Sequence, residues 1–259
     1  MDINILINNG VDVNHGLELL GDMETYNSII EDFLSEFDNR MQRIDNYKTN
    51  NDMENYSIEV HSLKSDSKYL GFMKLADISY QHELASKAGD VATVNNTYND
   101  LVSEANRIIS VVKQYLNKEE ATPVVHEENT MDQNKKTILI ADDSSIIREF
   151  VKEIFSEQYN VKAASTGREV ADIIREDPNN VAVLLLDLNM PDINGFQVLE
   201  WFKENDLFRL IPVSVITGAN DKESIDKAFS YPIVDMLNKP FEKETVKDIV
   251  EKTIEYRNV

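Results

Sequence analysis

Polar side chains that could do chemistry follow four short apolar runs in the second half of the chain. Asp142 and Asp143 follow ILIA, Asp187 follows VAVLLL, Thr217 follows VSVI, and Lys239 follows IVDMLN. Two carboxylates 4 Å apart repel by roughly 4 kcal/mol at an effective dielectric of 20, so three gathered carboxylates favour a divalent cation. An all-oxygen ligand set favours Mg²⁺ over zinc. With a lysine and a hydroxyl nearby, the set suits phosphoryl transfer to an ionised aspartate.

The apolar runs themselves predict the elements that would position these side chains. The predicted strands are Thr137–Ala141, Asn160–Ala164, Val181–Leu186, Pro212–Ile216 and Ile233–Leu237. Helical patterns alternate with them near 144–158, 167–176, 195–205, 221–229 and 242–257. Because continuous apolar strands are buried on both faces, we expect an α/β doubly wound parallel five-stranded sheet over 137–259. Ligands bind outside the carboxyl ends of such strands, so the scattered polar residues should converge there.

Four segments of this half, ADDSS, LLLDLNMPDINGF, ITG and LNKPF, resemble the response-regulator receiver domain, which has a flavodoxin-like fold. The resemblance implies that Asp187 is the phosphoacceptor, that Thr217 and Lys239 hold phosphoryl oxygens, and that a cis peptide precedes Pro240. The implied Mg²⁺ ligands are Asp142 (through water), Asp143, Asp187 and the backbone carbonyl of Asn189. An aspartyl-phosphate hydrolase with a DxD loop is disfavoured, because Asn189 stands two positions after Asp187.

One position departs from the receiver pattern. The family places an aromatic residue three positions before the lysine, and here that residue is Met236. Met236 is outside the implied ligand set, so phosphorylation should survive the change. Whether the output face rearranges in the usual way stays open.

The first half of the chain has the periodicity of long helices. Apolar residues at three- and four-residue steps predict helices near 22–47, 52–70, 73–88 and 91–116. Short connections imply antiparallel neighbours, hence an all-α four-helix bundle over 1–116. Residues 117–136 contain a proline and scattered charges without periodicity, which predicts a flexible linker.

His61 lies on the second of these helices. A wheel of about 100° per residue gathers one inward stripe and puts His61 about 140° from it. The stripe is Tyr56, Val60, Leu63, Ser67 and Leu70. The imidazole is therefore expected to face solvent beside Lys64, Ser65 and Lys68, with Ile58 as an exposed apolar neighbour. A catalytic triad lacks a nucleophile motif, and a metal site lacks a second ligand on the same face.

The sequence around His61 resembles a histidine-phosphotransfer (HPt) domain. His61, Leu63, Lys64, Ser67 and Gly71 match its motif, and the small Ser65 replaces the usual glycine. The resemblance implies that His61 is a phosphoacceptor, supported by Lys64, Ser65 and Lys68. The other histidines, His15, His82 and His126, have no such context and are interpreted as ordinary structural or surface residues.

Composition narrows the class of protein further. The 259 residues hold 26 Lys+Arg, 47 Asp+Glu and no cysteine, with a net charge of -21 spread over both halves. This acidity disfavours nucleic-acid binding, and the lack of cysteine excludes disulfides and thiolate sites. The longest apolar run, Val181–Leu186, is far shorter than the roughly 20 residues that span a membrane. Without a signal-peptide pattern, a cytoplasmic protein with no membrane partner is expected.

These patterns together predict a phosphorelay intermediate in which phosphoryl groups occupy His61 and Asp187. No ATP-binding kinase region is recognisable, so a separate sensor histidine kinase should supply phosphate, and a downstream receiver or HPt protein could accept it. The chain would then be a self-phosphorylating transfer protein and no metabolic enzyme. The alternative is a phosphorylation-controlled protein-binding module without onward transfer, and a constitutive acidic scaffold is a third reading.

Overall fold

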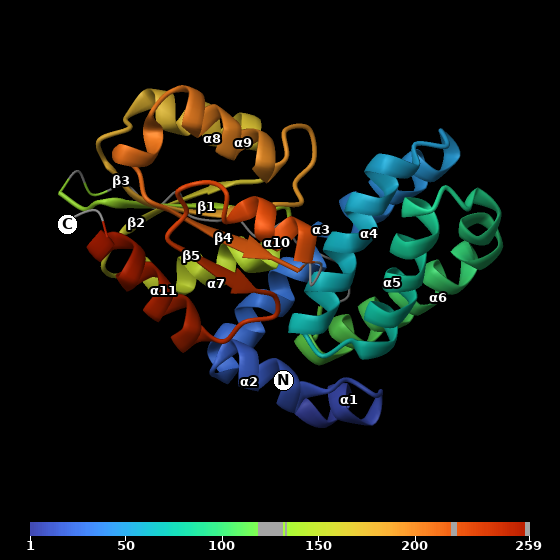
Figure 1. The fold of residues 1–259 in the computed structure, drawn as a ribbon. Coiled ribbons are helices and arrows are strands. Elements are labelled where there is room, and N and C mark those ends of the chain that lie inside the picture. Colours follow the sequence, from blue (N-terminus) through green and yellow to red (C-terminus); the bar gives the residue numbers. More distant parts are fainter. Residues whose placement is uncertain (119–131, 133, 219–221, 257–259) are drawn as a thin grey trace. The chain divides into compact units, whose positions relative to one another are not determined.

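The computed structural model describes residues 1–118, 132, 134–218 and 222–256, and the chain divides into two compact units, Met1–Glu127 and Glu128–Val259 (Figure 1). Most of the predicted linker, 117–136, lies outside the described residues. No described helix is both long enough and apolar enough to cross a membrane.

The first unit is helical, as predicted, but its described residues form six helices and not four. They are α1 (Ile3–Asn8), α2 (Val13–Leu20), α3 (Met23–Thr49), α4 (Met53–Tyr69), α5 (Met73–Lys87) and α6 (Val91–Leu116). The four long helices agree with the predicted ranges to within two residues at each end. The two short helices, of 6 and 8 residues, were missed because so few turns carry little periodic signal.

Aspartates begin most of these helices. The side chains of Asp12, Asp22, Asp52 and Asp90 each accept a hydrogen bond from the backbone N–H three residues later, at the starts of α2, α3, α4 and α6. Each such cap stabilises a helix by about 1 kcal/mol, and the negative charge also suits the positive end of the helix dipole. Part of the acidity of the chain therefore fixes where its helices start.

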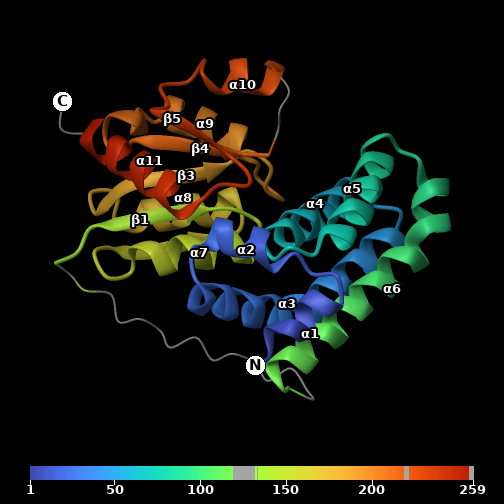
Figure 2. The ribbon, with the colours of Figure 1, turned by 90° about the horizontal axis from the view of Figure 1, so that it is seen from below.

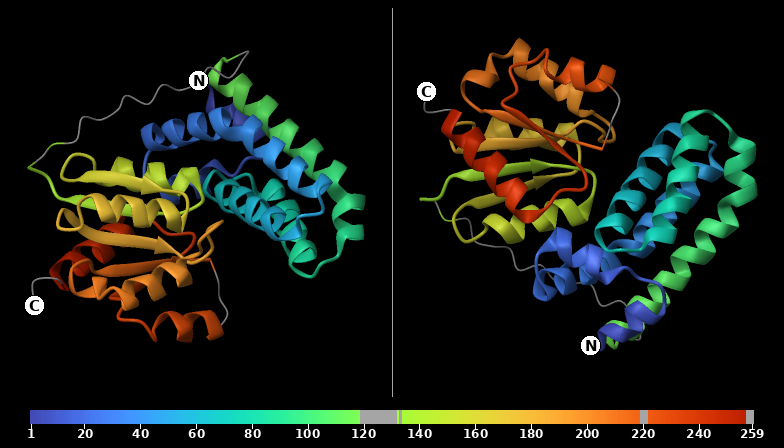
Figure 3. Two further views of the ribbon diagram at one scale, coloured as in Figure 1. Left: turned by 90° about the horizontal axis from the view of Figure 1, so that it is seen from above. Right: turned by 60° about the horizontal axis from the view of Figure 1, so that its bottom comes forward.

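The four long helices close into a ring in which α3 contacts α4, α4 contacts α5, α5 contacts α6, and α6 contacts α3. Figures 2 and 3 show them side by side. The short α2 packs on α3 and α4, while α1 packs on α6. The helix α4 thus has neighbours on three sides, and most of its residues are buried.

The described residues of the second unit form a five-stranded parallel sheet in the order β2-β1-β3-β4-β5. Its strands are β1 (Thr137–Ala141), β2 (Asn160–Ala164), β3 (Val181–Asp187), β4 (Val213–Thr217) and β5 (Asp235–Asn238). The winding direction reverses between β1 and β3, the place where ligands bind in doubly wound sheets. Every residue of β1, β3 and β4 is buried, which explains their unbroken apolar sequences.

Among the described residues, four α-helices and one short 3-10 helix lie between successive strands, and a fifth α-helix follows β5. They are α7 (Ser145–Phe155), α8 (Gly167–Glu176), α9 (Gly195–Glu204), η1 (Leu207–Arg209), α10 (Lys222–Ala228) and α11 (Lys243–Tyr256). Contacts pair α7 with α11 and α8 with α9, and Figure 1 shows these pairs on opposite faces of the sheet. The predicted doubly wound fold is confirmed.

Candidate functional site

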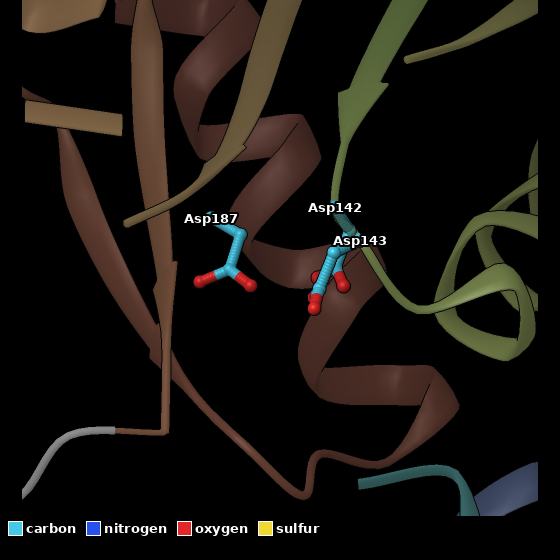
Figure 4. A group of neighbouring side chains, drawn as sticks. All are labelled: Asp142, Asp143 and Asp187. Carbon is cyan, nitrogen blue, oxygen red and sulfur yellow. The ribbon is translucent and has the colours of Figure 1, made fainter. Parts of the chain in front are cut away.

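Three carboxylates converge where β1 and β3 end. One oxygen from each of Asp142, Asp143 and Asp187 lies within 4.8 Å of the others, and Figure 4 shows the side chains facing one gap. Asp142 and Asp187 are fully buried, whereas Asp143 is half-buried. The sequence placed these residues at neighbouring strand ends, and the structure brings them together.

Lys239 supplies a positive charge to this cluster. Its Nζ lies 2.8 Å from Oδ2 of Asp142 and 2.7 Å from Oδ2 of Asp187, and its side chain is 5% exposed. The backbone N–H of Lys239 donates to the carbonyl of Thr217 at 2.8 Å, which ties the end of β5 to the end of β4. Thr217 is buried there. The peptide between Lys239 and Pro240 is cis, as the receiver resemblance implied.

The protonation of the cluster follows from its burial. Burial raises the pKa of Asp142 to about 7, against the lowering effect of Lys239. Burial lowers the pKa of Lys239, but Asp142 and Asp187 outweigh it and the net shift is upward. One lysine faces three carboxylates, so the cluster carries more negative than positive charge.

The loop after β3 holds the Asp187 side chain and backbone in place. The N–H of Asn189 donates to Oδ1 of Asp187 at 3.1 Å. Gly195, at the start of α9, lies so close that an added Cβ would be 2.2 Å from the carbonyl oxygen of Asp187. A side chain at Gly195 would therefore push on the backbone that carries Asp187. Met236, at the position that is aromatic in receivers, packs half-buried against the hydrophobic core.

These residues fit a hard divalent cation. All the convergent donors are carboxylate oxygens, the donor type that Mg²⁺ prefers, and the excess negative charge beside Lys239 would be relieved by a cation. Asp142, Asp143 and Asp187 would hold it.

The solvent-facing placement predicted for His61 is wrong. His61 is 6% exposed, Ser65 is also 6% exposed, and Ile58 is half-buried. The wheel assumed one buried stripe, whereas α4 packs against α2, α3 and α5. Lys64 and Lys68 are half-buried.

A carboxylate from the next helix contacts His61. Glu83 of α5 places Oε1 2.7 Å from Nδ1 of His61, and it is 4% exposed. Two lysines complete the group: Lys64 Nζ lies 2.6 Å from Oε2 of Glu83, and Lys87 Nζ lies 2.6 Å from Oε1. Lys64 Nζ is also 3.1 Å from Nδ1 of His61. We call His61, Glu83, Lys64 and Lys87 the histidine cluster.

Glu83 was not identified from the sequence, although one feature of α5 marks it. The buried residues of α5 are Leu75, Ala76, Ser79, His82, Glu83 and Ser86, which recur at helical spacing. A glutamate inside such a stripe must have a partner, because an unpaired buried carboxylate is costly. Glu83 could therefore have been recognised as a paired residue, though not assigned to His61.

Charges in the histidine cluster shift one another. Burial raises the pKa of Glu83, but hydrogen bonding and charge from His61, Lys64 and Lys87 outweigh it and hold that pKa far below its usual range. Burial lowers the pKa of Lys64 more than Glu83 raises it. Glu83 is thus an ionised carboxylate at neutral pH.

The remaining histidines have separate surroundings. His15 is in the first turn of α2, where its backbone N–H donates to the Asp12 cap. His82 is buried between α4, α5 and α6, with Nδ1 2.7 Å from the Tyr56 hydroxyl and Nε2 3.1 Å from Oγ1 of Thr97. His126 lies outside the described residues.

Comparison with known families assigns a class to each unit. Residues 28–118 match the model of the Hpt domain, and residues 138–251 match the model of the response regulator receiver domain. The chain therefore joins an HPt domain to a receiver domain, which makes it a two-component phosphorelay protein.

Three similar proteins each align with less than half of this chain. It is 33% identical over 109 residues to a Vibrio cholerae protein named "Probable cyclic di-GMP phosphodiesterase", covering 42% of this chain and 24% of that protein. It is 27% identical to the two-component response regulator ORR5 of Oryza sativa, over 45% of this chain and 87% of ORR5. It is 35% identical to the response regulator RR06 of Streptococcus pneumoniae, over 40% and 46%.

Among solved structures, a response regulator receiver domain protein from Clostridium thermocellum aligns with 24% identity and a TM-score of 0.44. The alignment covers 48% of this chain and 97% of that structure.

Proposed function

We propose that this chain is a phosphorelay intermediate in which Asp187 and His61 are both phosphoacceptors. The observation that carries the proposal is the buried cluster of Asp142, Asp143, Asp187 and Lys239, in a unit that matches receivers and is joined to one that matches HPt domains. The proposed domains are 1–116 and 137–259, connected by 117–136.

At the receiver site, the Asp187 carboxylate would attack the phosphorus of a phosphohistidine donor, forming an O–P bond as the N–P bond breaks and its electron pair returns to the donor's imidazole. Lys239 is already 2.7 Å from the Asp187 carboxylate and would pair with the oxygens of the incoming phosphoryl group. Thr217, at the end of the adjacent strand, would donate its hydroxyl to another oxygen. Mg²⁺ held by Asp142, Asp143, Asp187 and the Asn189 carbonyl would neutralise charge that develops on the phosphoryl oxygens.

The proposed partners follow from the two acceptors. A phosphohistidine on a separate sensor kinase would load Asp187, and His61 would exchange phosphate with this receiver or with a receiver on another protein. Lys64 and Lys68 provide positive charge on the same helix as His61, and the small Ser65 lies between them.

The proposal is tested with acetyl phosphate as a small acyl-phosphate donor. With Mg²⁺, the full chain should acquire an alkali-labile phosphate on Asp187, and chelation of the metal should abolish it. Asp187→Asn should remove this label, whereas His61→Gln should leave it. Absence of label on Asp187 in the folded chain would contradict the proposed receiver chemistry.

The same experiment distinguishes a phosphorelay intermediate from a phosphorylation-controlled protein-binding module. Label that moves from Asp187 to an acid-labile, alkali-stable linkage on His61 supports relay within the chain. Label that stays on Asp187, together with a binding partner whose affinity changes with Asp187→Asn and not with His61→Gln, supports a binding module.

A further inference from the structure

We propose that His82 makes phosphotransfer at His61 sensitive to acid, because the neutral His82 ring joins α5 to both α4 and α6 and a protonated ring cannot keep both contacts. The proposal rests on the proposed role of His61 as a phosphoacceptor. It adds regulation of that site by a histidine that no motif marks.

Hydrogen bonds on both sides hold the His82 ring. Its Nδ1 lies 2.7 Å from the hydroxyl oxygen of Tyr56 on α4, and its Nε2 lies 3.1 Å from Oγ1 of Thr97 on α6. His82 is 1% exposed and Tyr56 is fully buried. One buried imidazole therefore links α5 to each of the two long helices that it contacts.

The position of each hydrogen in this network follows from the hydroxyl of Thr97. Thr97 Oγ1 donates its only hydrogen to the backbone carbonyl of Thr93 at 2.8 Å, so it must accept from Nε2 of His82. Nδ1 of the neutral ring then has a lone pair, which accepts the hydrogen of the Tyr56 hydroxyl. Every donor in the network has an acceptor only while the His82 ring is neutral.

Acid breaks this arrangement at a defined atom. Since Nε2 already carries a hydrogen, a proton from solvent can bind only to Nδ1, and the His82 ring becomes a cation with two donors. Nδ1 can then no longer accept from Tyr56, whose hydroxyl has no other hydrogen-bond partner among the described residues. An unpaired buried hydroxyl and a buried charge both disfavour the closed structure.

The groups that face His82 come from both helices that pack on α5. They are Tyr56 from α4, and Thr97 and the carboxylate of Asp100 from α6. The pKa of His82 is lowered by burial, against the opposing effects of Thr97 and Asp100. Burial, with a smaller effect of Tyr98, raises the pKa of Tyr56, which therefore stays a neutral donor. These surroundings favour the neutral His82 ring.

The histidine cluster lies directly beside this network. Glu83, the residue after His82 on α5, is paired with the two lysines of the cluster and places Oε1 2.7 Å from Nδ1 of His61. Tyr56 and His61 both lie on α4, so two adjacent side chains of α5 contact the same helix. A movement of α5 that lets water reach a charged His82 ring would therefore also alter the surroundings of His61. Acid should slow transfer at His61 for this reason, before the helical unit unfolds.

The first test follows the histidine rings by ¹⁵N NMR while the full chain is acidified without phosphate. In wild type, His82 should carry its hydrogen on Nε2 at neutral pH and gain the second on Nδ1 at a midpoint below the ordinary 6.5. Backbone signals of α5 and ring signals of His61 should change at that same midpoint. His61 also titrates on its own, so His82→Gln provides the reference in which only the titration of His61 remains.

His15→Gln is the matched control for the loss of one histidine. His15 lies on α2, where its backbone N–H donates to Asp12, and the variant should keep the wild-type changes at the His82 midpoint. A His82 ring that stays neutral in the folded chain down to pH 5 would overturn the proposal. So would a ring that gains its proton without any change at α5 and His61 relative to His82→Gln.

The second test measures transfer itself. Asp187 is loaded with acetyl phosphate and Mg²⁺, and the growth of label on His61 is timed one pH unit above and one pH unit below the His82 midpoint. The wild-type rate divided by the His82→Gln rate should fall at least about fivefold, which corresponds to the loss of one buried hydrogen bond. Effects of acid on the receiver site cancel in this ratio, because both proteins share that site. An equal ratio at the two pH values would overturn the proposal and leave the proposed function intact.

His82→Asn serves as a second variant, because its amide oxygen lies near the position of Nδ1 and can accept from Tyr56. It replaces His82→Gln in both measurements if that variant does not fold. If wild-type His61 accepts no phosphate at either pH, the proposed function is contradicted. The NMR titration then still decides whether protonation of His82 changes the surroundings of His61.

Discussion

The two proposed phosphoacceptors are held by different kinds of structure. Asp187 lies in a cluster formed at the ends of four parallel strands. Its partner Lys239 is 52 residues away in the sequence, and the order of the strands in the sheet brings the two side chains together. His61 is held by side chains of two neighbouring helices, chiefly Glu83 of α5. The first site is built by backbone topology, and the second is built by one buried carboxylate and its cations.

The largest expected effect tests the strand-built site. Lys239→Met should slow phosphorylation of Asp187 by acetyl phosphate at least about 100-fold, because a preorganised charge on the phosphoryl oxygens is lost. The rate is followed by mass spectrometry of the intact chain. Lys252→Met, which removes an exposed lysine paired with Asp235 on the same unit, is the control and should keep the rate. If Lys239→Met is phosphorylated at a rate within a few-fold of wild type, Lys239 does not stabilise the phosphoryl oxygens and the strand-built site is not preorganised as described.

A second prediction concerns the glycine that closes the His61 helix. Gly71 has φ +74°, and an added Cβ would be 2.1 Å from the carbonyl oxygen of Asp12; Gly89 has φ +69° with nothing within 4 Å. Gly71→Ala should destabilise the helical unit by about 2–4 kcal/mol, from the left-handed backbone and the clash together, and Gly89→Ala by about 1–2 kcal/mol. The free energy of unfolding of each variant is measured from NMR signals of the helical unit during a urea titration. Equal losses of stability in the two variants would contradict the tight packing of Gly71 against Asp12.

The two sites differ in how much of their structure could be predicted from the sequence. Asp142, Asp143, Asp187, Thr217 and Lys239 could be placed together in advance, since parallel strands deliver their carboxyl ends to one edge. Four long helices were also predictable from periodicity. The surroundings of His61 were not, because a wheel describes one helix alone and α4 contacts three others. Glu83 lies on another helix, and no local pattern states which histidine a buried glutamate will meet.

The two units should also respond to acid in opposite ways, and the receiver unit should show the larger response. When a chelator keeps the site free of metal, the pKa of Asp142 in the folded chain is about 7, above the ordinary 3.8 of an unfolded aspartate. The folded state then binds the extra proton, so stability should rise as the pH falls from 7.5 to 5. Fluorescence of Trp201, the single tryptophan, reports this unit during urea unfolding. Asp142→Asn should flatten the trend; an equal slope in that variant would exclude Asp142 as its source.

In the helical unit, His82 should make folding stability depend on pH in the opposite direction and to a smaller extent. Burial lowers the pKa of His82 below its ordinary 6.5, although Thr97 and Asp100 act to raise it. The neutral ring is favoured in the fold, so its contribution is complete above pH 6.5 and is lost as the pH falls through the lower folded value. Relative to His82→Gln, wild type should therefore lose stability between pH 7 and 5, measured by urea titration followed by NMR. A difference that does not vary with pH would contradict this assignment.

The relay itself is tested most directly by following ³¹P NMR of the full chain with time after loading Asp187 with acetyl phosphate and Mg²⁺ and removing the donor. We expect the acyl-phosphate signal to decay while a phosphohistidine signal grows. His61→Gln should show only the acyl-phosphate signal, and Asp187→Asn should show neither signal. Decay of the acyl phosphate to inorganic phosphate alone, with both units folded, would contradict the relay.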